Sequence, residues 1–249
     1  MTSRMRAIDQ WKPTKFEERA GHWRPSRDPL ELARTSRVSS TLALEILEGA
    51  LKRHSRGHLA DFGCGKVPFY GIYADLVDQV TCIDWPNSAH ESNHIDIEAD
   101  LNCPICVDDA IFDTIFCSSV LEHIWDHRMM WREMTRSLKP GGTMIMGVPF
   151  IYGLHEVPHD YFRWTRYAFE KACEENGLEI VELEPYGGGI DVVADLLVRS
   201  LGIISDRLAG VAGRIAANLL RGGRARRIAP AAFEALPMGY LLVARKPEN

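Results

Sequence analysis

The feature that most constrains this chain is residues 59–65, where an apolar strand-like run leads into an acidic residue and a turn. The run reads Leu-Ala-Asp-Phe-Gly-Cys-Gly, and a second strand-like run at 80–83 ends in Asp84. Glycines at alternate turn positions let the backbone approach a ligand closely, and a carboxylate at the next strand tip can accept hydrogen bonds from ribose hydroxyls. The pattern predicts a doubly wound α/β sheet that holds a nucleoside.

The turn differs from the one that binds dinucleotides. That motif is G-x-G-x-x-G, whereas Pro68 stands at the position of its third glycine. Proline also lacks the backbone amide that would face a pyrophosphate. Asp61, just before the first glycine, is a poor neighbour for a pyrophosphate but suits a ligand with an ammonium group.

Residues 61–65 resemble the first motif of the class I S-adenosylmethionine-dependent methyltransferases. Further fragments match this family in the same order, and together they cover about residues 57–185: Asp100-Leu101-Asn102, Phe112-Asp113, Val120-Leu121-Glu122-His123 and Leu138-Lys139-Pro140-Gly141-Gly142. The chain is most similar to the small-molecule, methyltransferase-domain-11-like branch. One departure is Val67, which stands where many members have a third glycine.

The resemblance implies a fold and a cofactor. The fold is a Rossmann-like, mostly parallel seven-stranded sheet with an antiparallel last strand, and the cofactor is S-adenosyl-L-methionine. Each cofactor contact falls on a residue of this chain. Asp61 would meet the methionine amino group, Gly63 and Gly65 would admit the backbone, Asp84 would bind ribose, Trp85 would pack on adenosine, Asp100 with the Leu101 amide would read adenine, and the stretch that begins at Ser118 would lie beside the sulfonium. The alternatives are a simple tight turn, a surface acid at 84 and a packing role for Trp85.

The chemistry is expected in the segments that follow the fourth and fifth strands, because ligands of open α/β sheets lie at the carboxyl ends of the strands. Residues 149–165 are dense in aromatic and ionisable side chains. A hydroxyl acceptor must lose its proton, and histidine is the usual base near neutral pH. His159 is the first candidate, followed by His155 and His123, with Asp160 or Glu156 available to orient a ring. The alternative is that these histidines only fix the loop.

Four residues of the same loop are candidates for substrate contact: Tyr152, Asp160, Tyr161 and Arg163. Arg163 could hold a carboxylate or phosphate with two parallel hydrogen bonds, or form a structural salt bridge. The expected reaction is O-methylation of a saccharide or another small hydroxylated metabolite. An N- or C-methyltransferase, or a non-catalytic protein that binds the cofactor, are the alternatives.

Metal dependence is not expected from the sequence. His155 and His159 have the spacing of two ligands on one helical face, but Pro158 disfavours a helix there, which leaves only loop ligands such as Glu156 or Asp160. Cys103 and Cys106 form a single CxxC pair, and no second pair follows at zinc-ribbon spacing. The cysteines are therefore expected to be reduced thiols.

The chain has 249 residues, enough for one large α/β domain. We expect an N-terminal arm at 1–27, packed on the domain or over the cofactor, and a methyltransferase domain at 28–249 with a helical insertion at about 189–235. The net charge of −5 argues against general binding of nucleic acid, although seven Lys and Arg residues lie within residues 4–27 and four arginines within 221–227. The N-terminus has no apolar signal core, which predicts a cytoplasmic protein.

Two interpretations of the insertion are open. Apolar residues recur every three or four positions from Leu197 to Leu219, which predicts an amphipathic helix. Charged residues interrupt it, so a transmembrane span is not expected. It would be a cap on the core or a homodimer surface, or it would lie on the inner face of a membrane through residues 190–227.

The remaining elements follow from periodicity and turn residues. Asp28-Pro29 can begin a helix that Gly57 ends, and a second helix is expected at 68–77. The expected later elements are strands at 58–62, 79–84, 94–97, 112–118, 143–148, 179–184 and 240–244, and helices at 125–138 and 165–176.

Overall fold

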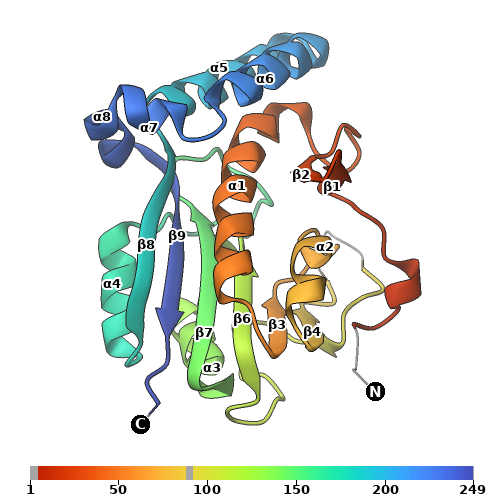
Figure 1. Cartoon of the computed structure of the whole chain (residues 1–249), viewed down its shortest axis with the longest axis vertical. Coiled ribbons are helices and arrows are strands. Elements are labelled where there is room, and N and C mark those ends of the chain that lie inside the picture. The colour runs from red at the N-terminus through yellow and green to blue at the C-terminus, as the bar shows by residue number, and fades with distance from the viewer. Residues whose placement is uncertain (1–4, 88–91, 249) are drawn as a thin grey trace.

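A seven-stranded sheet forms the centre of the molecule in the computed structural model, which describes residues 5–87 and 92–248 (Figure 1). The strand order is β5-β4-β3-β6-β7-β9-β8. The strands are β3 (His58–Phe62), β4 (Gln79–Asp84), β5 (Ile97–Glu98), β6 (Phe112–Ser118), β7 (Leu138–Pro149), β8 (Glu179–Gly188) and β9 (Pro237–Arg245).

The first five strands in space pair in parallel, and β9 runs antiparallel to both β7 and β8. This confirms the expected Rossmann-like sheet with an antiparallel last strand. The register places Asp61 beside Cys82 and Phe62 beside Ile83, so the turn after β3 meets the end of β4 at Asp84.

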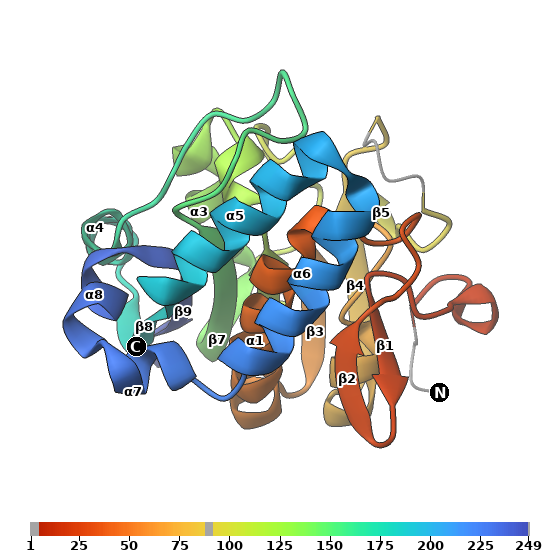
Figure 2. The same cartoon turned by 90° about the horizontal axis from the view of Figure 1, so that it is seen from above.

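Helices cover both faces of the sheet (Figures 1 and 2). One core lies beneath α1 (Arg37–His54) and α2 (Tyr70–Tyr73), and the other beneath α3 (His127–Ser137) and α4 (Arg166–Glu175). Thr165 and Asp126 cap α4 and α3, because their side chains accept hydrogen bonds from the amides of Ala168 and Met129. The cap at Thr165 confirms the expected start of α4.

Two of the predicted helices have different bounds. The first begins at Arg37 and not at Asp28, whose carboxylate instead accepts a hydrogen bond from the Leu30 amide in a turn. The expected helix at 68–77 is only α2, followed by the 3-10 turn η3 (Ala74–Leu76). Local capping by aspartate can stabilise a turn as well as a helix, which is why the first prediction was wrong.

The N-terminal residues form two short pieces of structure. After the 3-10 turn η1 (Ile8–Gln10), strands β1 (Phe16–Arg19) and β2 (His22–Pro25) pair in a hairpin. Phe16 of β1 is fully buried against Phe69, and the Trp11 indole N–H donates to the Val67 carbonyl at 3.2 Å. This segment therefore packs on the face of the domain that carries α2.

The predicted amphipathic stretch is an α-helical hairpin, not one helix. Helix α5 (Ile190–Ile204) ends at Ser205, whose side chain caps α6 (Asp206–Leu220) by accepting a hydrogen bond from the Leu208 amide. Two short helices, α7 (Arg224–Ile228) and α8 (Pro230–Ala235), lead to β9. Figure 1 shows α5 and α6 across the end of the sheet where β8 finishes.

One side of this hairpin is packed on the domain. Val192 and Val198 of α5 and Ala209 of α6 are buried with Val38 and Leu42 of α1. Across the described residues, no helix combines the length and the apolar character needed to cross a bilayer. The division into arm, domain and insertion stays a prediction.

Candidate active site

The glycine turn after β3 has the backbone conformation that the sequence predicts. Gly63 and Gly65 have φ values of +70° and +51°, in the left-handed region that favours glycine. The Gly63 amide donates to the Ile83 carbonyl at 2.8 Å, which holds the turn against the end of β4. A Cβ at Gly63 would lie 2.3 Å from the Val120 side chain, so only glycine fits.

Val67 shows why the family pattern has a glycine at this position. Its φ is +50°, and its side chain is fully buried beneath the hairpin and α2. A β-branched residue with positive φ is strained, by about 1–3 kcal/mol. The packing of Val67 offsets this cost, so the turn keeps its shape without the third glycine.

Asp61 and Asp84 are buried at the tips of β3 and β4. The Tyr73 hydroxyl donates to Asp61 Oδ2 at 2.8 Å, while Asp84 accepts the Gly65 amide on Oδ2 at 2.5 Å and the Trp85 amide on Oδ1 at 2.7 Å. Burial raises the pKa of Asp61 and the charge of Asp84 adds to this effect, so that the pKa is about 7 despite the opposing hydrogen bond from Tyr73. The two carboxylates therefore influence each other at one edge of the sheet.

This arrangement fits a cationic nucleoside. The hydrogen bond to Asp61 comes from a neutral hydroxyl, so an ammonium or sulfonium nearby would stabilise its ionised form. Trp85 follows Asp84 directly and is half-buried at the rim. Asp61, Gly63, Gly65, Asp84 and Trp85 are therefore brought together.

The other cofactor candidates lie at the neighbouring strand ends. Asp100 is exposed and accepts two hydrogen bonds from Asn102, through its amide and its side chain, while Leu101 is buried in the core. Ser118 ends β6 beside Gly147 of β7. Their cofactor contacts stay predictions.

The loop after β7 brings the three histidines together with a buried acid. His123 and His155 pack edge to face with ring centroids 4.6 Å apart, and His123 Nδ1 lies 2.6 Å from the His159 carbonyl. Glu122 is fully buried, and its Oε1 is 3.8 Å from His123 Nε2 and 3.7 Å from His155 Nε2. The sequence comparison placed Glu122 in a family fragment but gave its side chain no role.

Asp160 and Arg163 hold the loop in shape. Arg163 donates to both oxygens of Asp160, at 2.6 and 2.8 Å, and its guanidinium also approaches the carbonyls of Tyr152 and Gly153. The bonds from Arg163 lower the pKa of Asp160 to about 2. Asp160 also accepts the His155 amide at 3.1 Å. Of the two roles considered for Arg163, the geometry favours the structural salt bridge.

The charges around His155 act in opposite directions. Burial lowers the pKa of His155, but Glu122 and Asp160 outweigh this effect and raise it above the ordinary histidine value. Tyr152, on the other side of the ring, packs beneath the Arg199 guanidinium at 4.2 Å and donates a hydrogen bond to Ser36 at 3.3 Å. Tyr152 therefore joins the loop to α5.

His159 and Tyr161 lie at the exposed side of the loop. His159 Nδ1 is 2.9 Å from the Tyr161 hydroxyl. The rings of His159 and Trp85 pack edge to face with their centroids 5.7 Å apart. Tyr161 in turn contacts Trp125, which is 68% exposed. A continuous row of aromatic rings thus runs from Trp85, next to Asp84, to the outer surface of the loop.

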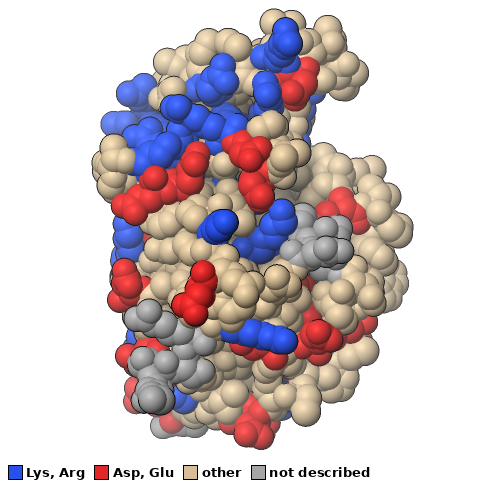
Figure 3. All heavy atoms as spheres, turned by 90° about the vertical axis from the view of Figure 1, so that its right-hand side faces the viewer, with Lys and Arg blue, Asp and Glu red and all other residues tan. Residues whose placement is uncertain are grey.

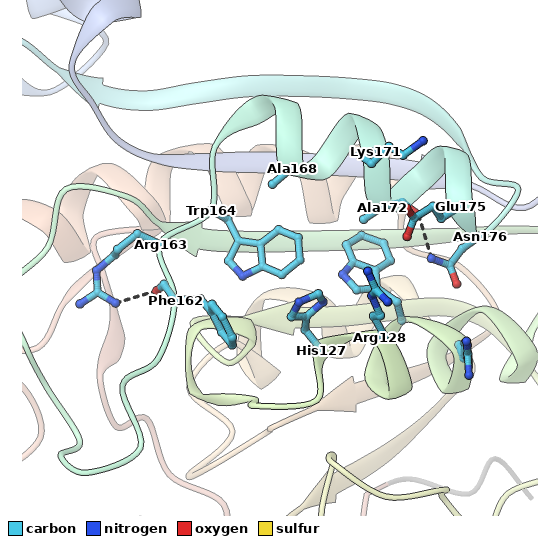
Figure 4. Close-up of a pocket in the computed structure, with 12 residues that line it drawn as sticks. His127, Arg128, Phe162, Arg163, Trp164, Ala168, Lys171, Ala172, Glu175 and Asn176 are labelled. Carbon is cyan, nitrogen blue, oxygen red and sulfur yellow. Dashed lines mark hydrogen bonds between the residues drawn. The ribbon is translucent and has the colours of Figure 1, made fainter.

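A separate hollow of about 520 Å³ lies between α3 and α4 (Figure 4). The rings of His127, Phe162 and Trp164 line it, and Arg163 points away from it. It lies on the helical layer and not at the glycine turn, so the cofactor residues are not part of it.

The comparisons with known proteins agree with this geometry. Residues 60–146 match the family model of a methyltransferase domain, and no curated protein matches the chain by sequence. Together with the seven-stranded fold, this match identifies residues 60–146 as a methyltransferase domain of the class I, S-adenosylmethionine-dependent type, with S-adenosylmethionine as its cofactor. The matched segment runs from β3 to β7, so the loop after β7 and the helices at 190–235 lie outside it.

Solved structures share the fold. A Haloferax volcanii complex of the activator Trm112 with a protein described as a methyltransferase gives a TM-score of 0.54 at 18% identity, covering 86% of this chain and 97% of that one. The [4+2]-cyclase SpnF gives a TM-score of 0.53 at 18% identity, covering 86% of this chain and 84% of that one. The Haemonchus contortus phosphoethanolamine N-methyltransferase 2 bound to S-adenosyl-L-methionine gives 0.50 at 17%, covering 87% and 59%. Identities this low establish the fold alone.

Proposed function

We propose that the protein transfers a methyl group to an oxygen atom of a saccharide or another small hydroxylated metabolite. The row of aromatic rings from Trp85 through His159 and Tyr161 to Trp125 carries this proposal. Exposed aromatic faces at the mouth of a site suit the apolar faces of sugar rings. The same row contains a histidine beside the cofactor residues, where a base would be needed.

His159 is the proposed general base. When its Nδ1 donates to the Tyr161 hydroxyl, Nε2 carries the lone pair that a base requires. The bound cofactor supplies an activated methyl group. His159 would accept the proton that the acceptor hydroxyl loses when its oxygen is methylated. Tyr161 and the Asp160–Arg163 pair hold the loop that positions this ring.

A methyl-transfer assay with fractionated cell extract as the acceptor source tests the proposal. We expect a methylated product whose new methyl group mass spectrometry places on oxygen. The His159→Asn variant should lower kcat by about 10²–10⁴-fold while the Kd for the cofactor stays unchanged, which is the usual contribution of a positioned base. His22→Asn, on the exposed side of β2, is the matched control and should keep full activity.

Three results would contradict the proposal. Methylation on nitrogen or carbon would favour the alternative reaction, and an unchanged kcat in His159→Asn would exclude this base. Cofactor binding without turnover on any fraction would favour a non-catalytic binding protein.

We also propose that the α5–α6 hairpin docks on an anionic membrane surface at the cytoplasmic face. On α6 most large apolar residues are exposed and the buried residues are small ones such as Ala209, Gly210 and Gly213, whereas α5 buries Val192 and Val198 and exposes most of its other large apolar residues. The exposed large residues include Val193, Leu196, Leu197, Ile203, Ile204, Leu208, Val211, Ile215 and Leu219. An apolar face of this kind, combined with positive charge, is typical of helices that lie on a membrane.

Charge selects the membrane over a second copy of the chain. Burial lowers the pKa of Arg19, and Arg27, Arg24 and Arg221 lower it further against Glu17, so the two arginine clusters lie near each other. Figure 3 shows Lys and Arg gathered over the upper part of one face. This positive patch suits anionic lipid headgroups and would repel an identical patch. The proposed acceptor site would then lie next to the membrane.

A further inference from the structure

Three potential metal ligands converge beneath the loop that follows β7. Glu122 and His123 belong to the 3-10 turn η4 (Leu121–His123), and His155 comes from the loop. One ligand atom from each lies within 4.8 Å of the others. A tetrahedral zinc ion with ligands at about 2.1 Å keeps its ligand atoms roughly 3.4 Å apart. The two distances from Glu122, 3.8 and 3.7 Å, are close to this value, whereas the two histidine nitrogens would have to move closer together by up to about 1.4 Å.

Glu122 is the unusual member of this cluster. Its side chain is 0% exposed, and neither carboxylate oxygen has a hydrogen-bond partner within residues 5–87 and 92–248. Burial of an ionised carboxylate without compensation costs several kcal/mol. An ionised carboxylate at this position would need a cation beside it. Among the described residues, His123 Nε2 is also buried there without a hydrogen-bond partner.

The orientation of both rings supports a metal. His123 Nδ1 lies 2.6 Å from the His159 carbonyl, and His155 Nδ1 lies 3.1 Å from the Gly153 carbonyl. A carbonyl oxygen can only accept a hydrogen bond. Each ring, when neutral, therefore carries its proton on Nδ1 and a lone pair on Nε2. The two Nε2 atoms are the atoms that approach Glu122. Metal-ligating histidines commonly have this arrangement, with the other nitrogen donating to a carbonyl.

We propose that Glu122, His123 and His155 bind a divalent transition metal, with zinc as the favoured ion. Two imidazoles and one carboxylate suit zinc and the related ions of this series. Glu156 Oε2 lies 3.9 Å from His123 Nε2 and can supply a fourth ligand or give way to an oxygen of a bound molecule. The binding site is independent of the reaction, so it stands or falls separately from methyl transfer.

The sequence contains another histidine pair with ligand spacing, which Pro158 disfavours. His155 and His159 have ligand spacing along the chain, but His159 contributes its carbonyl to His123 and directs its ring to Tyr161 and Trp85. His159→Asn is therefore a control inside the same loop. The rival explanation is that the histidines beside Glu122 are protonated. They would then form imidazolium–carboxylate pairs with it, and no metal would be needed.

Binding of Zn²⁺ to the full-length, tag-free and chelator-treated protein tests the site. Cys103 and Cys106 are exposed thiols that could bind zinc elsewhere, so the background is Cys103→Ser/Cys106→Ser. We expect one equivalent of Zn²⁺ to bind by calorimetry and to raise the Tm. Co²⁺ should give visible bands of four-coordinate cobalt without a thiolate band.

The variants separate the possible outcomes. Glu122→Gln and His155→Asn should each weaken Zn²⁺ binding by at least tenfold, whereas His159→Asn and His22→Asn should leave it unchanged. Circular dichroism shows whether each variant is folded, and His155→Asn changes a loop residue and not the core. No saturable binding of Zn²⁺, Co²⁺ or Mn²⁺ to the background protein would overturn the proposal in favour of protonated histidines. Loss of binding in His159→Asn alone would overturn the assigned ligands.

Discussion

Asp61 lies at the tip of β3 with 3% of its surface exposed, and its side chain accepts a hydrogen bond from the neutral Tyr73 hydroxyl. Its pKa is about 7, above the value of 3.8 for a free aspartate, because burial disfavours the ionised form. Between about pH 4 and 7 the folded protein therefore holds a proton that the unfolded chain has lost. The free energy of unfolding falls as the pH rises through this range.

The substitution Asp61→Asn should remove this pH dependence. In the cofactor-free protein, we expect the variant to match the wild type near pH 4 and to exceed its stability at pH 8, by up to about 4 kcal/mol for a shift of roughly three pKa units. Urea unfolding across this pH range measures the difference, with Asp9→Asn as the matched control. A difference that does not change with pH would contradict the assignment.

The same residues show what could be predicted at this scale. Asp61, Gly63, Gly65 and Asp84 were placed correctly at the strand tips, because short-range spacing at the end of a strand fixes their positions. Glu122 could not be given a role, because its surroundings depend on a loop that begins almost thirty residues later. Pro158 argued against a helical pair of His155 and His159, and the structure has a loop there, but nothing in the sequence indicated that His155 lies beside His123.

At the scale of elements, predictions were accurate where burial determined the pattern. Strands β3, β4 and β6 have the predicted bounds, because their apolar runs are buried on both sides. The start of α1 and the break at Ser205 were missed. No side chain caps α1, so the sequence has no capping signal at Arg37. The break at Ser205 does depend on a capping serine. A serine inside an apolar repeat gives little indication whether it interrupts a helix or lies on its surface.

The exposed face of the α5–α6 hairpin predicts binding to anionic vesicles. The protein should sediment with vesicles that contain phosphatidylglycerol and not with pure phosphatidylcholine, and added salt should weaken the binding. Ile203→Glu/Ile204→Glu should weaken it by at least tenfold, since each isoleucine contributes about 1.5–3 kcal/mol when buried. Both residues are more than three-quarters exposed, so folding should be unaffected.

Val181→Glu, at an exposed position of β8, is the control for added negative charge. A dimer in solution that Ile203→Glu/Ile204→Glu converts to a monomer, without any vesicle binding by the wild type, would show that the face contacts a second copy instead.

At the scale of the whole molecule, the sheet brings the candidate residues for the cofactor and for the acceptor to the carboxyl ends of its parallel strands. The tips of β3 and β4 carry the cofactor residues, and the loops after β6 and β7 carry the histidines and the aromatic row. The α5–α6 hairpin covers the end of the sheet where these loops lie (Figure 2). The family fragments were sufficient to predict the mostly parallel sheet with its antiparallel last strand and the cofactor. The surroundings of the loop after β7 depend instead on contacts between segments distant in sequence.

Calorimetric titration of the full-length protein with S-adenosylmethionine tests the central claim most directly. The account predicts saturable binding of one equivalent, with a Kd at least tenfold weaker in Asp84→Ala, since a hydrogen bond to a charged group contributes about 1.5–3 kcal/mol. Asp78→Ala, at an exposed position just before β4, should bind like the wild type. A titration without binding heat and with an unchanged Tm at saturating cofactor, or equal affinity in Asp84→Ala, would contradict it.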